Sequence, residues 1–193
     1  MSRVCLIRHG ETDWNVEGKL QGRTDIPLNK SGILQAEECS EFLKSSEWDV
    51  IITSPLVRAK HTAEIINKNI GVPLIEMMEL LERDYGDAEG LTNEVRIKIY
   101  PDKIYPNQED RSSLSKRVMS GLQRIVEDFG ESKILLVAHG AVINVILANL
   151  SNGEIGSGKT KLMNACISSI NFHQEEWKID NYNQISHLSC YNN

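Results

Sequence analysis

The sequence has no long apolar run. None of its hydrophobic stretches approaches the ~20 residues that a helix needs to cross a bilayer. The N-terminus also lacks an apolar segment of signal-peptide length, because the stretch VCLI runs directly into Arg8. These absences lead us to expect a cytoplasmic protein that does not bind membranes.

Basic residues are in the minority. The chain has 21 Lys and Arg against 27 Asp and Glu, for a formal net charge of −6, and no basic stripe stands out. Proteins that bind nucleic acid carry an excess of positive charge on the binding face, so this balance argues against a nucleic-acid partner. A small cationic pocket remains compatible with it.

Cysteine is scarce and scattered. The four cysteines form no C-x-x-C pair and have the spacing of neither a disulfide framework nor a zinc site. No Asp/His cluster has the spacing of metal ligands either. The sequence therefore predicts reduced thiols, no bound metal and no cofactor.

Strands and helices alternate along the chain. We expect strands at 3–9, 49–53, 72–77, 133–139, 166–173 and 176–180. Helices are expected from Ser31, as N-cap, to about Lys44 with Ile33 and Leu34 facing inward, over 54–67 with Pro55 in the first turn, over 114–129 and over 141–150. This order predicts an α/β fold of three layers, α/β/α, with a mostly parallel sheet, helices on both faces and an antiparallel edge strand. We expect a single domain over 1–193, with 186–193 as a loose tail.

Two stretches of the sequence are candidates for binding a phosphate group. GEIGSGKT at 153–160 fits the G-x-x-x-x-G-K-[ST] phosphate-loop pattern, which works only between a strand and a helix. The nearest strand ends far upstream at His139, and the residues after Thr160 are too few for the rest of an NTPase domain. We therefore predict a mobile, solvated surface loop with an exposed Lys159, and set aside a nucleotide-binding NTPase.

The second stretch is LIRHGETDWN at 6–15. Arg8 and His9 fall at the end of the first strand, and Gly10 allows a sharp turn there. His139 and Gly140 repeat the His-Gly pair at the end of a later strand. Because open α/β sheets bind ligands at the carboxyl ends of their strands, we expect both imidazoles to line one crevice.

Four stretches together resemble the histidine phosphatase superfamily. They are LIRHGETDWN, TSPLVRAKHTA at 53–63, LLERDYGDAEG at 80–90 and LLVAHG at 135–140. The resemblance covers about 3–172 and implies a phosphoglycerate mutase-like fold. The family includes cofactor-dependent phosphoglycerate mutase and small bacterial phosphatases.

The resemblance also implies a role for each matching residue. His9 would be the nucleophile that becomes phosphohistidine, and Arg8 and Arg58 would bind the phosphoryl oxygens. His139 would be a further phosphate ligand as an imidazolium, and Glu82 would be the general acid and base. The remaining phosphate-binding candidates are Gly10, Asn15, Gln21, Gly22 and Gly140. Glu11 and Glu89 match the family pattern without an assigned step.

These residues predict a metal-independent phosphatase acting on a small phosphorylated metabolite. Phosphoglycerate mutase-type transfer and alpha-ribazole phosphatase activity, a step of cobalamin synthesis, are the alternatives. A binding module for phosphoproteins would not need His9 and Glu82, so their presence counts against it. The chain departs from the family pattern at Ala88, where many members have Trp, and at 106–114. It also lacks the extra segments of the glycolytic mutases, and this third departure favours hydrolysis over transfer. We expect these departures to affect the pocket rim. The sequence leaves the oligomeric state open.

Overall fold

A six-stranded sheet forms the centre of the molecule in the computed structural model, which describes residues 2–191. The strands are β1 (Ser2–Arg8), β2 (Val50–Thr53), β3 (Leu74–Glu76), β4 (Lys133–Ala138), β5 (Ile167–His173) and β6 (Glu176–Gln184). Their order across the sheet is β3-β2-β4-β1-β5-β6. The first four are parallel, while β5 runs antiparallel to β1 and β6 runs antiparallel to β5. The predicted sheet with its antiparallel edge is confirmed.

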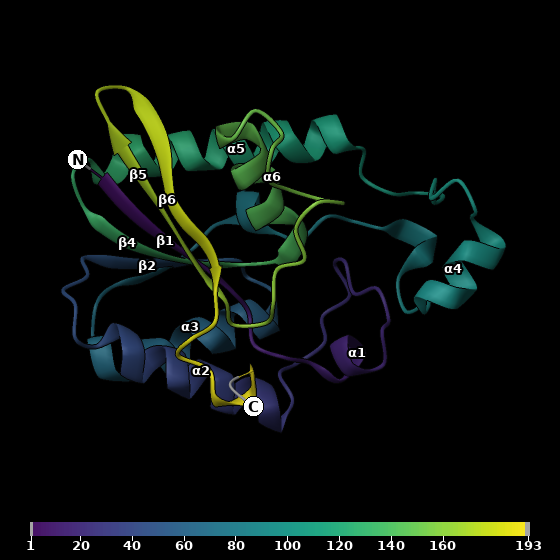
Figure 1. Cartoon of the computed structure of the whole chain (residues 1–193), viewed down its shortest axis with the longest axis horizontal. Coiled ribbons are helices and arrows are strands. Elements are labelled where there is room, and N and C mark those ends of the chain that lie inside the picture. The colour runs from purple at the N-terminus through teal and green to yellow at the C-terminus, as the bar shows by residue number, and fades with distance from the viewer. Residues whose placement is uncertain (1, 192–193) are drawn as a thin grey trace.

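Helices cover both faces of this sheet (Figure 1). On one face lie α2 (Lys30–Leu43) and α3 (Val57–Ile70), and on the other lie α5 (Arg111–Phe129) and α6 (Gly140–Leu150). Two short helices, α1 (Asp13–Val16) and α4 (Asn93–Ile99), lie in stretches for which we predicted neither a helix nor a strand. Short 3-10 turns are at Met78–Leu80, Gly86–Ala88 and Ser189–Tyr191.

The central strands supply the core on both faces. Leu6, Ile52 and Leu136 belong to the cluster under α5 and α6, while Ile7 and Leu135 face α2 and α3. This alternation follows from the period of two in a strand, and burial on both faces explains why β1, β2 and β4 are continuous apolar runs. The rigid sheet fixes where each strand ends.

Three predicted helix starts are wrong. Helix α5 begins at Arg111, three residues before Leu114, because the side chain of Asp110 accepts a hydrogen bond from the Ser113 N–H and acts as the N-cap. Helix α2 begins one residue before Ser31 because the side chain of Asn29 accepts a hydrogen bond from the Gly32 N–H and acts as the N-cap. Its inner face is made by Gln35, Ala36, Cys39, Ser40 and Leu43, whereas Leu34 is 50% exposed. Pro55 precedes α3, whose N-cap is Leu56, so it lies outside the first turn.

The end of the chain also differs from the expected loose tail. Leu188 is fully buried and packs with the core under α2 and α3. The backbone N–H and hydroxyl of Ser189 both bond Glu38, and His187 contacts Cys39 and the Ala165 carbonyl. Residues 186–191 are therefore packed onto the domain, and 192–193 lie outside the described residues.

Candidate active site

The site residues come from the carboxyl ends of four parallel strands. Strand pairing places Arg8 opposite Ala138, so that His9 directly after β1 and His139 directly after β4 lie side by side. Their rings are 5.3 Å apart between centroids. Arg58 follows β2 at the start of α3, and Glu82 lies in the segment after β3. The sheet thus brings together side chains that are far apart in the sequence.

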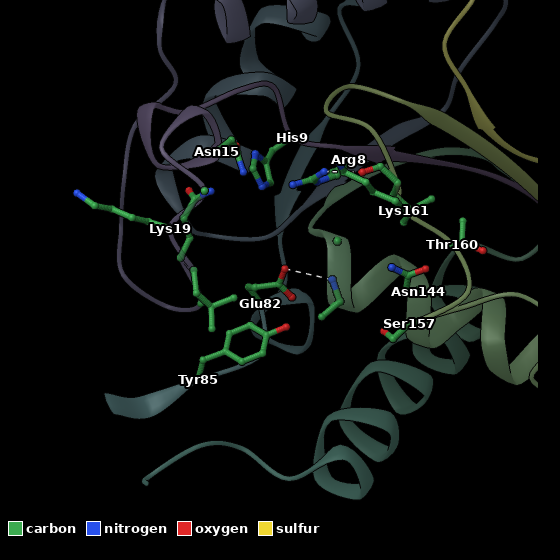
Figure 2. Close-up of a pocket in the computed structure, with 18 of the residues that line it drawn as sticks. Arg8, His9, Asn15, Lys19, Glu82, Tyr85, Asn144, Ser157, Thr160 and Lys161 are labelled. Atoms are coloured by element: carbon green, nitrogen blue, oxygen red, sulfur yellow. Dashed lines mark hydrogen bonds between the residues drawn. The ribbon is translucent and has the colours of Figure 1, made fainter. Parts of the chain in front are cut away.

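A cavity of about 660 Å³ opens at this edge of the sheet. That size lies within the ~300–1,000 Å³ typical of small-molecule sites. Its lining includes Arg8, His9, Asn15, Gln21, Gly22, Arg58, Glu82 and Gly140, which are eight of the predicted site residues. Figure 2 shows His9 and Asn15 side by side, with Glu82 across the cavity from them.

The orientation of His9 is fixed by its backbone neighbour. Its Nδ1 lies 2.7 Å from the carbonyl oxygen of Gly10. A carbonyl only accepts, so Nδ1 carries the proton and Nε2 keeps its lone pair. Burial and the nearby charges of Arg58 and Arg8 hold the pKa of His9 well below its usual value. The ring is therefore a neutral base at physiological pH.

Gly10 supports His9 and does not line the cavity. Its N–H donates to the hydroxyl of Thr62, so it is taken up before a ligand arrives. A β-carbon at this position would lie 2.4 Å from the backbone oxygen of Gly32, where the loop crosses the first turn of α2. Phosphate binding by Gly10 stays a prediction that these contacts do not favour, and the position requires glycine because two backbones approach closely.

Two arginines are held rigidly by carbonyl oxygens. Arg58 is 1% exposed and donates from its two terminal nitrogens to the carbonyls of Gly22 and Thr24, at 2.7 and 3.0 Å. Arg8 donates to the carbonyl of Leu162 at 2.6 Å. The Nε atoms of both arginines are buried and have no hydrogen-bond partner within the described chain. Buried donors are seldom left unpaired, so these two mark a place for an anionic acceptor.

His139 lies behind the cavity lining and is fully buried. Its Nε2 is 2.7 Å from the hydroxyl of Ser54, and its Nδ1 has no partner among the described residues. Burial, Arg58 and His9 lower the pKa of His139 well below its usual value. The expected imidazolium is therefore wrong for the free protein, because a second cation so close to Arg58 is unfavourable.

Glu82 lies at the N-terminus of α6. Its carboxylate oxygens accept hydrogen bonds from the backbone N–H of Arg83 at 2.9 Å and of Ala141 at 3.2 Å, the latter drawn as a dashed line in Figure 2. Burial nevertheless raises its pKa above the usual value, against the pull of these bonds and of the arginines. A carboxyl group with a raised pKa is suited to carry a proton near neutral pH.

Asn15 and Gln21 have partners that orient their amides. The side-chain oxygen of Asn15 accepts from Thr12 N–H and from the amide of Asn164, so its NH₂ group remains for a ligand. The oxygen of Gln21 accepts from the Thr12 hydroxyl. Two further family-pattern residues are structural: Glu89 accepts from the backbone of Arg23, Thr24 and Tyr85, and Glu11 from the amide of Asn29.

The sequence did not single out several residues at the site. Ser54, Thr62 and Asn164 hold His139, Gly10 and Asn15, while Tyr85 and Asn144 line the cavity. Ser54 lies within TSPLVRAKHTA beside Arg58, a signal that could have found it. Asn144 is a polar residue among the apolar residues of helix α6, and this interruption is a signal that could have found it. Ala88, expected at the rim, is fully buried and is absent from the cavity lining because it packs inward.

The stretch 153–160 is not a phosphate loop, because it follows helix α6 and leads toward β5. Lys159 is exposed, as expected, and its ammonium donates to the carbonyl of Gly153. It is nevertheless no remote surface loop, since Ser157 to Leu162 line the same cavity as His9. The residues that match the phosphate-loop pattern therefore form part of the cavity wall.

The mostly parallel sheet carries two histidines, two arginines and a buried carboxyl group at its strand ends, a set of side chains suited to an anionic ligand. Residues 4–185 match the model of the histidine phosphatase superfamily (branch 1), and the chain belongs to that family. Its fold is phosphoglycerate mutase-like.

Similar proteins match over nearly the whole chain. The chain is 52% identical over 189 residues to the phosphatase PhoE of Bacillus subtilis, covering 98% of both proteins. It is 31% identical to a metal-independent phosphoserine phosphatase of Arabidopsis thaliana, covering 98% of this chain and 84% of that protein. The structure of Bacillus stearothermophilus YhfR superposes with a TM-score of 0.91 at 26% identity, covering 97% of this chain and 99% of that one. The phosphatases among these relatives support a phosphoric monoester hydrolase.

Within residues 2–191, no helix is both long and apolar enough to cross a membrane. In the same range, no three His, Cys, Asp or Glu side chains gather as a metal-ligand cluster.

Proposed function

We propose that the protein hydrolyses small phosphomonoesters in two steps through a phosphohistidine at His9, without a metal ion. The observation that carries this proposal is the state of His9. It is neutral, its Nδ1–H is held by the Gly10 carbonyl, and the ring lines a cavity shared with two arginines and a buried carboxyl group. A neutral imidazole with one fixed proton has its other nitrogen free for attack.

In the first step, Nε2 of His9 attacks phosphorus and the ester P–O bond breaks. Glu82 gives its proton to the departing alcohol oxygen, so the alcohol leaves neutral. Arg8 and Arg58 bind the phosphoryl oxygens, and their unpaired Nε–H groups supply fixed donors to the charge that develops there. His139 is a neutral ring with Ser54 donating to its Nε2, and its Nδ1–H becomes a donor where a phosphoryl oxygen passes between the lining residues in front of it.

In the second step, the carboxylate of Glu82 takes a proton from water. The resulting hydroxide attacks the phosphohistidine, the P–N bond breaks, and inorganic phosphate and neutral His9 are released. Glu82 then again holds the proton with which the cycle began. The raised pKa of this carboxyl supports both roles, since the group must gain and lose a proton in each turnover.

Hydrolysis is favoured over mutase-type transfer because PhoE, which is named a phosphatase, is 52% identical to this chain, against 31% for a probable phosphoglycerate mutase, GpmB of Klebsiella pneumoniae. The Arabidopsis relative, which is a metal-independent phosphatase, supports the same reading. The likeness to probable phosphoglycerate mutases extends to the sequence, at 31% identity, but a shared fold and family do not by themselves assign an activity.

The test measures phosphate release from a panel of phosphomonoesters, with EDTA present throughout. The panel contains p-nitrophenyl phosphate, 3-phosphoglycerate, phosphoserine, alpha-ribazole phosphate and glycerol 3-phosphate. We expect turnover that EDTA does not reduce and that His9→Ala abolishes. Isomerisation of 3-phosphoglycerate faster than its hydrolysis would instead assign the mutase reaction, and activity lost in EDTA would overturn the metal-independent step.

A further inference from the structure

Asn144 is an exception on helix α6. Its neighbours Val142, Ile143, Ile146 and Leu147 are fully buried and apolar, as in an ordinary core helix. Asn144 is itself 9% exposed, and its side-chain oxygen is buried without a partner in the described chain. Burying an unpaired amide oxygen is unfavourable, so a residue of this kind points to a ligand that supplies the missing donor.

The position of Asn144 places it on the leaving-group side of the proposed reaction. It follows Ala141 by three residues, and residues three apart lie on the same face of a helix. The backbone N–H of Ala141 holds Glu82, the proposed acid that protonates the leaving oxygen. Both Asn144 and Glu82 line the cavity, and Figure 2 shows Asn144 across the cavity from His9 and Asn15.

Two hydroxyl groups accompany Asn144. Tyr85 and Ser157 line the same cavity, and Figure 2 shows them on the side away from His9. All three residues also line a second cavity of about 430 Å³. Its wall combines apolar side chains such as Leu114 and Ile155 with the basic side chains of Arg83, Lys103, Arg111 and Lys159. Tyr85, Asn144 and Ser157 therefore stand where the two cavities adjoin, so that a ligand reaching past Glu82 meets them first.

The loop that carries Ser157 is anchored to α6. Gly156 has φ +135°, and a β-carbon there would lie 2.7 Å from the β-carbon of Ala148. Its carbonyl accepts hydrogen bonds from the backbone N–H of Lys159 and Thr160, at 3.0 and 2.8 Å. This packing requires glycine and fixes Ser157 at the cavity. Gly156 of GEIGSGKT thus helps to shape a wall of the site.

We propose that Asn144, Tyr85 and Ser157 form a leaving-group subsite that recognises the hydroxyl groups of a polyol phosphate. The proposal rests on the phosphatase function argued above. All three side chains are uncharged, and each can both donate and accept a hydrogen bond, which matches a hydroxyl group. A carboxylate only accepts, so it would leave the amide oxygen of Asn144 unpaired.

The experiment compares glycerol 3-phosphate with n-propyl phosphate, which has the same carbon chain without the two hydroxyls. Because glycerol is also the better leaving group, the informative quantity is the change in the ratio of the two kcat/KM values. We expect Asn144→Leu to reduce this ratio by about 5–10-fold, the size of one hydrogen bond to a neutral group. Ser157→Ala, in the loop, should reduce it by a few-fold.

Asn149→Leu is the matched control. Asn149 lies on the same helix but is exposed, with its amide bonded to Ser115 and the Val145 carbonyl. It should leave the ratio unchanged. Should Asn144→Leu fail to fold, as judged by thermal melting, Asn144→Ala and Ser157→Ala provide the same comparison.

The subsite and the phosphatase proposal fail in different ways. Hydrolysis of p-nitrophenyl phosphate that depends on His9, together with an unchanged ratio in both subsite variants, would overturn the subsite alone. A larger loss on 3-phosphoglycerate than on glycerol 3-phosphate would overturn it in favour of a carboxylate. If the wild-type protein hydrolyses none of these esters, the phosphatase proposal fails and the subsite fails with it.

Discussion

The imidazole rings of His9 and His139 lie 5.3 Å apart and are tilted by 57° to each other. Each ring is held by one fixed partner, the Gly10 carbonyl for His9 and the Ser54 hydroxyl for His139. Within the described residues, the opposite nitrogen of each ring, Nε2 of His9 and Nδ1 of His139, has no hydrogen-bond partner. Two neutral imidazoles oriented in this way can serve one as nucleophile and the other as donor.

A phosphoenzyme at His9 is the first expected outcome. Rapid quenching with a ³²P-labelled phosphomonoester should show label that survives alkali and is lost in acid, because a phosphoramidate is acid-labile. His9→Ala should retain no label, whereas His173→Ala, at an exposed histidine on β5, should retain it fully. Label that survives acid would point to an ester of serine or threonine and contradict the role of His9.

Glu82→Gln tests the proton donor. The substitution keeps the shape of the side chain but removes the acid, so kcat on alkyl phosphates should fall by roughly 10²–10⁴-fold. The loss on p-nitrophenyl phosphate should be much smaller, since nitrophenolate leaves without a proton. Glu79→Gln is the control, because Glu79 lies in the same segment but pairs with Arg124 at the surface. An equal loss on both substrates would remove Glu82 from this role.

The pH dependence of kcat/KM should have two limbs of known sign. The pKa of His9 is lowered, so the nucleophile stays neutral until the pH falls below the usual histidine range, where activity is lost. The pKa of Glu82 is raised, so the acid stays protonated above the usual carboxyl range and activity on alkyl phosphates falls as the pH rises through that raised pKa. The alkaline limb should flatten with p-nitrophenyl phosphate. An alkaline limb of equal size on both esters would count against Glu82.

Arg58→Ala should lower kcat/KM on alkyl and nitrophenyl phosphates about equally, by roughly 10²–10³-fold, because Arg58 acts on the phosphoryl group common to both. Arg58→Lys should recover little. One ammonium cannot reach the carbonyls of Gly22 and Thr24 and a phosphoryl oxygen with the geometry of a guanidinium.

Lys60→Ala is the matched control for Arg58, since Lys60 lies on the same helix, is exposed and pairs with Glu76. It should leave kcat/KM unchanged. Near-wild-type activity in Arg58→Lys would show that a positive charge alone suffices at this position and that the planar geometry of the guanidinium group is not needed.

The sequence by itself determined the layers of the fold and the strand ends at which the candidate site residues lie. Apolar runs such as VCLI and ILLVA mark buried strands, and polar His-Gly pairs at their ends mark a binding edge, because hydrophobic period and turn chemistry are local properties. The four family stretches then named Arg8, His9, Arg58, Glu82 and His139. Local signals predict helix boundaries less well, as at α2, where Asn29 and Ser31 are both suitable N-cap residues and the structure uses Asn29.

Only the tertiary structure decided the protonation of the site and the shape of its outer wall. The neutral state of His139 depends on burial beside Arg58, which no local pattern records. The N–H of Gly10 donates a hydrogen bond to the hydroxyl of Thr62 on α3, a contact that the sequence did not predict. Asn144 reads in sequence as a polar interruption of an apolar helix, and GEIGSGKT reads as a phosphate loop. Folding packs Gly156 against Ala148 and brings both stretches to one cavity, because long-range packing determines which side chains share a space.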